Sequence, residues 1–284
     1  MRVSKVKKLT PIKRLAYWIT ERESIRLKKE AGEPRPWTDD EILDTFRFCN
    51  ARRMDDRVSQ WLLNNWYTPN YGHKNMAIAC TLARHLNLPG SLEAVGFPKV
   101  WKPYKTLYIL KKRTDAGLQV FNAAYIIRGA YYKPKIDSIV FDTTDGVATS
   151  PPKLDTNSME KCVTEMMQYW AVGSFIGGQI VADMRHAIPG KWKDKNTWAP
   201  IGPGSKKGMN IVHGRPEKQS LKQPQFLDEL RHLRIELANH LPSDIWGRLE
   251  GIDFQNTLCE LSKYTRALLG EGRPKQRYKQ HVGE

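Results

Sequence analysis

The sequence lacks the signatures of several common protein classes. Its four cysteines are isolated, and none forms a C-x-x-C pair, so we expect buried thiols in a reducing cytosol and no disulfide framework. The seven histidines show no zinc-site spacing. Neither a G-x-x-x-x-G-K-S/T phosphate loop nor a G-x-G-x-x-G segment occurs. ATP-driven and nicotinamide-dependent activities therefore have no support from the sequence.

Long apolar runs are also missing. No stretch approaches the roughly 18 residues of a membrane-spanning helix, and the basic N-terminus is not followed by the apolar segment of a secretory signal. We therefore expect a soluble, cytoplasmic protein. What the sequence has in excess is positive charge, since 46 Lys and Arg against 30 Asp and Glu give a net charge of +16. Such a field attracts polyanions, most often nucleic acid, and an anionic membrane surface is the alternative.

The periodicity of apolar residues predicts a mainly α-helical chain. We expect a basic N-terminal arm over 1–34, a helical domain over 35–269 and a basic tail over 270–284. A first helix is expected to begin with Thr38 as its cap, Glu41 as the capping-box partner, and to continue to Trp66. Further helices are expected over about 74–86, 157–169, 172–185, 225–240 and 252–268.

The least regular stretch is 97–155, which the sequence leaves open as a small insertion or a subdomain. Val120–Ile127 is compatible with a strand or a helix, and Ser138–Phe141 resembles a short strand. The predicted fold class is therefore mainly α with a small irregular or β insertion.

A glycine-rich segment precedes one of these helices. Gly202 and Gly204 form a G-x-G turn, and Ser205, Lys206 and Lys207 follow it. This pattern is typical of a helix-hairpin-helix clamp, in which backbone N–H groups press against a DNA phosphate and lysines add charge. These five residues are therefore candidates for DNA binding, and a plain surface turn is the alternative.

The helix expected over 252–268 carries a row of polar side chains. Asp253, Asn256, Glu260 and Lys263 are spaced three, four and three residues apart, so they project from one face. Two carboxylates, an amide and an amine in a row are suited to holding a base and moving protons. The competing interpretation is a solvated face with an ordinary Glu–Lys pair.

Two further segments carry polar residues in helical spacing. Arg53, Arg57 and Gln60 are expected to share a helix face that grips phosphates, with internal salt bridges as the alternative. Gln179 and Asp183 lie one turn apart on an otherwise apolar helix. Such a pair forms either a satisfied core network or a pocket wall, and the residue types favour the network.

Five segments in a fixed order resemble a known family. They are FCNARRMDDRVSQWL (48–62), FNAAYI (121–126), GGQIVADMRH (177–186), PIGPGSKKGMN (200–210) and IDFQNTLCELSKYTRALLGEGRPKQRY (252–278). The chain resembles bacteriophage amino acid:DNA transferases, the α-glutamyl/putrescinyl-thymine pyrophosphorylases, and the related helical domain of 5-hydroxymethyluracil DNA kinases. It departs from the family at FNAAYI, where F-T-G-A-Y-I is expected, and at LSKY, where F-D-K-Y is usual. These departures concern details of the pocket.

The resemblance implies a helix-hairpin-helix DNA glycosylase-like fold and the hypermodification of thymine in phage DNA. In that chemistry the amine of an amino acid or polyamine displaces pyrophosphate from 5-pyrophosphoryloxymethyluracil in double-stranded DNA. The missing phosphate loop favours the transferase branch over the kinase branch. No cofactor is required, and a divalent metal ion beside the pyrophosphate is compatible with the reaction. A glycosylase that uses the same flipped base and a non-catalytic DNA-binding module are the alternatives.

The same resemblance assigns expected roles to residues. Asp253, Glu260 and Asp183, in that order, are the candidate bases for the incoming amine, and Arg53, Arg57 and Lys263 are expected to stabilise the leaving pyrophosphate. Gln255 and Asn256 are expected to read the edge of the uracil. The remaining substrate-binding candidates are Asn50, Asp56 and Gln179.

Overall fold

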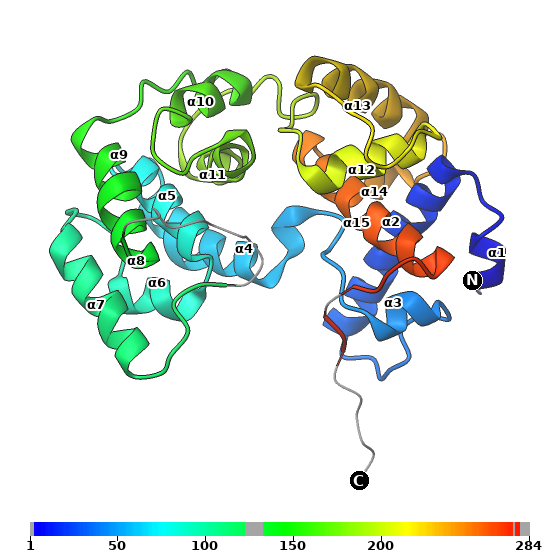
Figure 1. The fold of residues 1–284 in the computed structure, drawn as a ribbon, viewed down its shortest axis with the longest axis horizontal. Coiled ribbons are helices and arrows are strands. Elements are labelled where there is room, and N and C mark those ends of the chain that lie inside the picture. The colour runs from blue at the N-terminus through cyan, green and yellow to red at the C-terminus, as the bar shows by residue number, and fades with distance from the viewer. Residues whose placement is uncertain (1–2, 123–132, 275, 279–284) are drawn as a thin grey trace, which may run out of the picture. The chain divides into compact units, whose positions relative to one another are not determined.

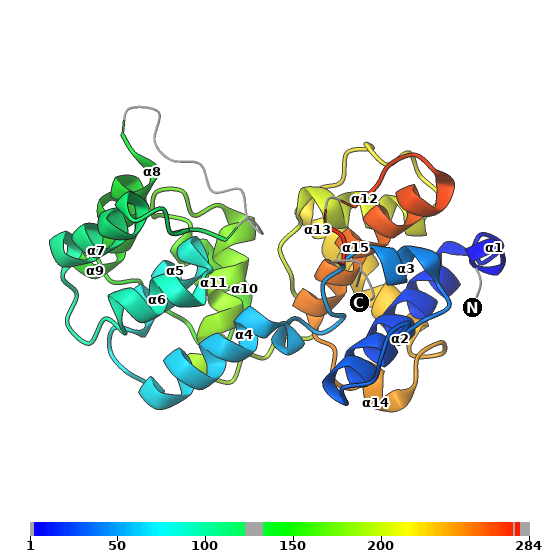
Figure 2. The ribbon, with the colours of Figure 1, turned by 90° about the horizontal axis from the view of Figure 1, so that it is seen from below.

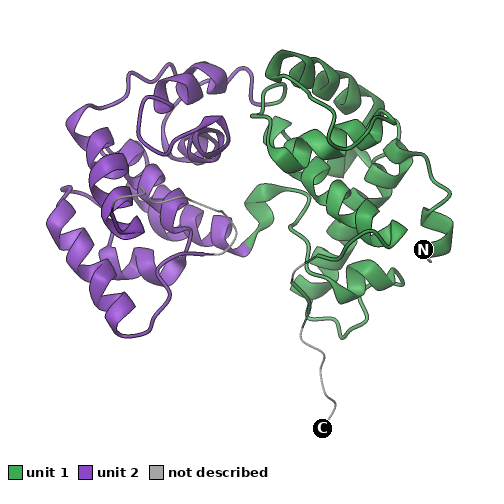
Figure 3. Cartoon of the chain, viewed as in Figure 1, with its two compact units in different colours: residues 1–56, 196–284 green, residues 57–195 purple. Residues whose placement is uncertain are grey.

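The computed structural model describes residues 3–122, 133–274 and 276–278, and these residues are mainly helical, as predicted (Figure 1). Within these ranges there is no strand, and an isolated antiparallel β-bridge joins Phe46 to Arg277. The chain divides into two compact units, 1–56 together with 196–284 (unit 1) and 57–195 (unit 2), which Figure 3 colours separately. The expected arm, central domain and tail therefore do not coincide with the units of the structure.

Unit 1 is assembled around its last helix. Its helical segments are α1 (Val3–Val6), α2 (Pro11–Glu30), α3 (Glu41–Thr45), the 3-10 turn η1 (Arg53–Asp55), α12 (Pro203–Val212), α13 (Gln223–Leu237), α14 (Ser243–Trp246) and α15 (Gly251–Leu269). Helix α15 packs against α2, α3, α12, α13 and η1, and Figure 2 shows this group of helices from below. Phe254, Leu258 and Leu261 of α15 are fully buried, so this helix forms the centre of the core.

Residues 11–30 belong to this core, although the sequence suggested a separate arm. Thr10 caps α2 by accepting a hydrogen bond from the Lys13 amide, and Pro11 is in the first turn. Leu15, Trp18 and Ile19 are fully buried. Their spacing of three and four residues places them on one helix face. The many basic residues between these apolar positions led to the prediction of a basic arm.

The long helix expected from Thr38 to Trp66 is wrong. Asp40, not Thr38, is the N-cap of α3, and its carboxylate also accepts hydrogen bonds from the hydroxyls of Tyr17 and Tyr264. The chain leaves the helix at Phe46, where the tail pairs with it. The Arg47 amide donates to the Gln276 carbonyl at 3.0 Å, and the Tyr278 amide donates to the Thr45 carbonyl at 3.1 Å. This tertiary pairing overrides the local helical pattern.

Unit 2 is also mainly helical in its described residues. Its segments are α4 (Arg57–Leu62), the π-helix η2 (Leu63–Tyr67), the 3-10 turn η3 (Thr68–Asn70), α5 (Met76–Leu86), α6 (Pro89–Val95), α7 (Pro103–Asp115), α8 (Lys135–Asp137), the π-helix η4 (Ser138–Thr144), α9 (Asp145–Thr149), α10 (Met159–Met166) and α11 (Ser174–Ala187). Helix α11 packs against α5 and α10. The core of unit 2 is formed largely by α5, in which every residue except Ala77 is buried.

The described part of the irregular stretch 97–155 consists of helices, of which α7 is the longest, joined by loops. The strand expected at Ser138–Phe141 is wrong, because these residues open the π-helix η4. The Thr144 hydroxyl donates to the Ile139 carbonyl there. The strand or helix predicted over Val120–Ile127 lies largely within 123–132, which are outside the described residues. The helices expected over 74–86, 157–169, 172–185, 225–240 and 252–268 are confirmed as α5, α10, α11, α13 and α15.

Candidate functional site

Helices α12 and α15 approach each other unusually closely at two glycines. A β-carbon on Gly204 would lie 2.2 Å from the Sγ of Cys259, and one on Gly208 would lie 2.0 Å from the carbonyl oxygen of Leu258. Any larger residue would therefore collide with α15. The sequence pattern assigned Gly204 to contact with a phosphate, whereas the structure requires it for helix packing.

The turn that begins α12 closes on itself. The Gly202 amide donates to the Ser205 hydroxyl at 2.9 Å, which satisfies a backbone donor at the helix start. Residues 188–202 lie between the end of α11 and the start of α12. Lys206 and Lys207 are half-buried beside it, and the charge of Lys207 reaches Cys259 and acts to lower its pKa against the raising effect of burial. The expected DNA contact of this turn stays a prediction.

Asp253 ties the segment around η1 to the start of α15. One carboxylate oxygen accepts a hydrogen bond from the Arg53 amide at 2.7 Å, and the other accepts one from the Glu250 amide at 2.9 Å. The side chain is only 3% exposed. Burial raises the pKa of Asp253 to about 6, against the lowering effect of these two hydrogen bonds. Both oxygens are engaged by backbone, so Asp253 acts as a clamp between two parts of the chain.

Asn50 is the central polar residue of the segment before η1. Its amide donates to the Asp56 carboxylate at 3.1 Å, and its side-chain nitrogen donates to the Asp55 carbonyl at 2.8 Å. From α15, the side-chain nitrogen of Asn256 donates to the Asn50 carbonyl at 3.2 Å. The expected roles of Asn50, Asp56 and Asn256 in one site thus have a geometric basis, because the fold brings all three together.

Arg22 supports the same segment from α2, although it was not among the residues selected from the sequence. Its guanidinium donates to the carbonyls of Phe48 and Cys49 and, at 2.9 Å, to the side-chain oxygen of Asn50. The side chain is 4% exposed. The available signal was its position, since Arg22 follows Leu15, Trp18 and Ile19 on the buried face of one helix.

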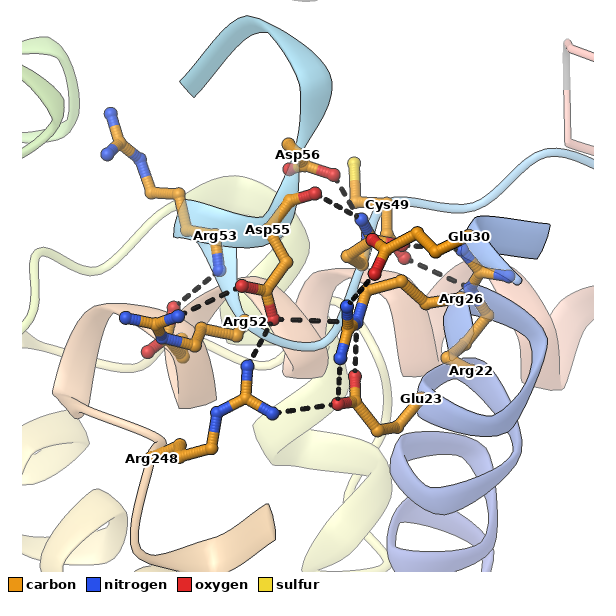
Figure 4. Close-up of polar contacts among 12 residues, drawn as sticks. Arg22, Glu23, Arg26, Glu30, Cys49, Arg52, Arg53, Asp55, Asp56 and Arg248 are labelled. Carbon is orange, nitrogen blue, oxygen red and sulfur yellow. Dashed lines mark hydrogen bonds and ion pairs between the residues drawn. The ribbon is translucent and has the colours of Figure 1, made fainter. Parts of the chain in front are cut away.

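An ion-pair network also holds η1, as Figure 4 shows. The Asp55 carboxylate is bound by Arg52 at 2.9 Å and by Arg248 at 3.0 Å, with Arg26 at 3.6 Å. Arg26 and Arg248 also bind Glu23. The side chains of Asp55 and Glu23 are each 8% exposed, and such shielding strengthens these pairs relative to surface salt bridges. Within this segment, Arg52 and Asp55 form an internal salt bridge, which was the alternative interpretation of its charged residues.

Glu260 and Lys263 form a second charged group near Asp56. The Lys263 ammonium lies 2.5 Å from the Glu260 carboxylate, whose side chain is 3% exposed, while Lys263 is exposed. Burial acts to lower the pKa of Lys263, but the Glu260 carboxylate outweighs it and raises that pKa. The Glu–Lys pair of the competing interpretation is therefore present, but its carboxylate is buried and does not belong to a solvated face.

Asp56, like Asp253, is a carboxylate whose pKa is raised by burial, and no ion pair is recorded for it among the described residues. Desolvation raises its pKa to about 6, and the Glu260 charge acts in the same direction. The Asn50 hydrogen bond and the charges of Arg53 and Arg22 act to lower it. An acid with a pKa near neutrality can both take and return a proton at physiological pH. Asp56 is therefore suited to proton transfer, whereas Lys263 stays protonated and is suited to stabilising negative charge.

The remaining candidates from the sequence are not part of the contacts among Asn50, Asp56 and Asn256. Arg53 is on η1, with its side chain directed away from the ion pairs in Figure 4, whereas Arg57 and Gln60 are on α4. The expected shared helix face of these three residues is wrong, because the chain is extended at Asp56 between the two elements. Gln255 is 3% exposed within α15.

Asp183 and Gln179 form part of the core of unit 2. The Asp183 carboxylate binds the Arg84 guanidinium through two contacts, of which one is 2.6 Å, and accepts a hydrogen bond from the Tyr67 hydroxyl at 2.7 Å. Asp183 is 1% exposed and Gln179 4%. Asp183 therefore lies in a core network, which was the favoured interpretation of this pair. A side chain that is buried and bonded in this way does not suit a base that must meet a substrate.

Two features are absent from the described residues. No group of three or more His, Cys, Asp or Glu side chains within them has the arrangement of a metal site. No described helix is long and apolar enough to cross a membrane.

The fold and the site together define a basic, helical domain with a polar cluster of carboxylates, amides and cations around η1 and α15. The chain belongs to the family described as "5-hmdU DNA kinase, helical domain", which matches residues 10–273. It is similar to the 5-hmdU DNA kinase of Bacillus phage SP10, with 27% identity over 294 aligned positions that cover 87% of this chain and 43% of the kinase. The chain thus spans less than half the length of this relative. No solved structure matches it significantly.

Proposed function

We propose that this protein takes part in thymine hypermodification of phage DNA, as a transferase that places the amine of an amino acid or polyamine on 5-pyrophosphoryloxymethyluracil. Its membership of the 5-hmdU DNA kinase helical-domain family supports a role in this chemistry. The given residues contain no phosphate-binding loop, so the proposal assigns no phosphorylation step to them. The observation that carries the proposal is the cluster of Asp56, Glu260 and Lys263 beside the Asn50 segment.

The reaction is a substitution at the methylene carbon attached to the uracil ring. A neutral amine donates its electron pair to this carbon, a C–N bond forms, and the C–O bond to pyrophosphate breaks with the electron pair leaving on oxygen. The amine then loses one proton to a base of the protein. The target base has to leave the duplex stack to meet a second substrate, and the negative charge that develops on pyrophosphate has to be stabilised.

The polar cluster suggests a division of roles. Asp56 accepts the amine proton, because its pKa of about 6 lies near the operating pH. Glu260 holds Lys263, whose exposed ammonium meets the leaving pyrophosphate together with Arg53. A divalent ion bound by the pyrophosphate itself would add to this charge. Asp253, expected to be the first candidate base, becomes a positioning residue in this scheme, because backbone amides occupy both of its oxygens.

Nucleoside mass spectrometry tests the proposal. DNA that contains 5-pyrophosphoryloxymethyl-deoxyuridine is incubated with the protein and a pool of amino acids and polyamines. We expect a new nucleoside whose mass equals the base plus one amine, together with released pyrophosphate. Unchanged nucleosides would leave a DNA-binding module, and abasic sites would indicate a glycosylase.

Variants separate the roles within this assay. Asp56→Asn and Glu260→Gln are each expected to lower the transfer rate by about 100-fold or more, as is typical of lost general-base or electrostatic catalysis. Glu236→Gln is the matched control, because Glu236 is an exposed carboxylate on α13 of the same unit. If Asp56 is the base, the wild-type rate rises with pH through about 6, and this rise is absent in Asp56→Asn.

A further inference from the structure

The outer face of α7 in unit 2 carries two large aromatic side chains that are left in solvent. Tyr104 is 78% exposed and Tyr108 is 65% exposed. They lie one helical turn apart and therefore share a face. The opposite face holds the buried Thr106 and Leu110, and through it α7 packs against α6, α8 and η4. Figures 1 and 2 both show α7 at the edge of its unit.

The contacts of these rings leave most of their surface available. The Tyr104 ring meets the edge of the Phe141 ring at a centroid distance of 5.2 Å, which holds the tyrosine in place without covering it. Paired exposed aromatic residues are uncommon on a surface that binds nothing, because each leaves apolar area in water. Tyrosine is also a favoured residue of binding surfaces, since its ring packs while its hydroxyl stays hydrated.

Four exposed lysines lie on α7 or just before it in the chain. Lys105 and Lys112 project from the same side of α7 within about 100° of Tyr104, as the 3.6-residue helical period requires. Lys99 and Lys102 precede the helix, and all four lysines are exposed.

The charge of these lysines is not neutralised within unit 2. Among the ion pairs formed by described residues, none involves these four lysines, whereas Lys111 pairs with Asp137 at 2.9 Å. Asp115 is the acidic residue at the end of this face. The α7 surface, defined as Lys99, Lys102, Tyr104, Lys105, Tyr108 and Lys112, is therefore both aromatic and positively charged.

We propose that the α7 surface binds single-stranded or locally unpaired DNA. Lysines at this spacing meet successive phosphates, and tyrosine rings stack on bases whose faces are free. A DNA duplex would satisfy the lysines but not the rings, because its base faces are already stacked on one another. The combination of unpaired cations with exposed rings therefore selects an opened strand over a duplex.

The inference deepens the proposed function and rests on it for the choice of DNA as the polyanion. Chemistry on a base requires that base to leave the stack, and a surface that binds unpaired nucleotides would stabilise a strand opened around the target. The binding test below contains neither an amine nor a pyrophosphorylated base. Its result is thus independent of whether the transfer reaction occurs.

Fluorescence anisotropy with a labelled 20-nucleotide oligo-dT strand and a matched duplex, at several NaCl concentrations, tests the proposal on the full chain. Tyr104→Ala with Tyr108→Ala is expected to weaken oligo-dT binding by about 30-fold or more, since removing each stack costs at least about fivefold. Tyr104→Phe with Tyr108→Phe retains both rings and is expected to bind like the wild type. Duplex binding is expected to change little in either variant.

Replacing Lys99, Lys102, Lys105 and Lys112 with Gln is expected to reduce the slope of log affinity against log salt by about 3, at about 0.7 for each phosphate contact on a single strand. Tyr71→Ala and Lys191→Gln are the controls, because both residues are exposed in unit 2 outside the α7 surface, and neither is expected to change binding. The proposal would be overturned if the double alanine variant bound oligo-dT as tightly as the wild type. An unchanged salt slope in the glutamine variant would also overturn it.

Discussion

The side-chain amide of Asn256 donates a hydrogen bond to the backbone carbonyl of Asn50, 206 positions earlier in the chain, at 3.2 Å. This bond joins the middle of α15 to the segment that carries Asp55 and Asp56. The segment is not part of a regular helix, so its backbone groups depend on such side-chain partners. Arg22 supplies the corresponding support from α2. The candidate site is therefore built by three separate parts of the chain.

Removing the Asn256 amide should loosen this segment specifically. Asn256→Ala is expected to lower the free energy of unfolding by about 1 kcal/mol, the usual value of one such hydrogen bond. Amide hydrogen exchange over 49–56 is expected to accelerate, which mass spectrometry of peptic fragments would detect. Ser262→Ala is the control, because it also removes a buried polar group from α15. Equal exchange in both variants would show that the Asn256 bond does not order the segment.

The raised pKa of Asp56 predicts a pH dependence of stability. Its pKa is about 6 in the folded protein and about 3.9 when unfolded, so the native state binds more protons between these values. Stability contributed by the neutral acid is therefore lost as pH rises from about 4 to 6. Asp56→Asn carries no such charge. Urea unfolding should show the variant gaining about 2 kcal/mol relative to the wild type between pH 4 and pH 7. A constant difference across this range would contradict the shift.

The contact between α12 and α15 predicts intolerance of any side chain at Gly208. A β-carbon there would lie 2.0 Å from the Leu258 carbonyl oxygen, so the helices would have to separate. Gly208→Ala is expected to cost about 3 kcal/mol or more, at the upper end of overpacking effects. Thermal unfolding followed by circular dichroism measures this cost. Gly173→Ala provides the comparison, since a β-carbon at Gly173 meets nothing within 4 Å, and a similar loss in both variants would refute the packing argument.

The ion pair between Asp183 and Arg84 predicts a structural effect in unit 2. Asp183→Asn leaves the Arg84 guanidinium buried without its counter-charge, which typically costs about 3–5 kcal/mol. Replacing both residues with apolar ones, as in Asp183→Leu with Arg84→Met, should recover much of this stability. Chemical denaturation of the single and double variants gives the comparison. A fully stable Asp183→Asn protein that has lost transfer activity would instead restore Asp183 as a candidate base.

Local patterns in the sequence were sufficient for much of the helical structure. Apolar residues three and four apart predicted α5, α10, α11, α13 and α15, because a helix that buries one face needs that spacing. The row of polar residues on α15 also led to Asn256, Glu260 and Lys263, which the structure places in the polar cluster. The strong positive charge was visible from composition alone, and the absence of a phosphate-binding loop was visible from the order of the residues.

Only the tertiary structure decided how these pieces act. The pattern over 38–66 suggested one helix, but pairing between Thr45–Arg47 and Gln276–Tyr278 draws the chain out of it. Asp253 and Glu260 are equivalent in a helical pattern, yet backbone amides engage Asp253, whereas Lys263 pairs with Glu260. Arg22 shows the same limit, since its partners at 48–50 lie far along the chain. Helix periodicity depends on residues three and four positions apart, so it can be predicted from the sequence. The partners and desolvation that set each carboxylate's role come from distant residues, which only the folded chain brings together.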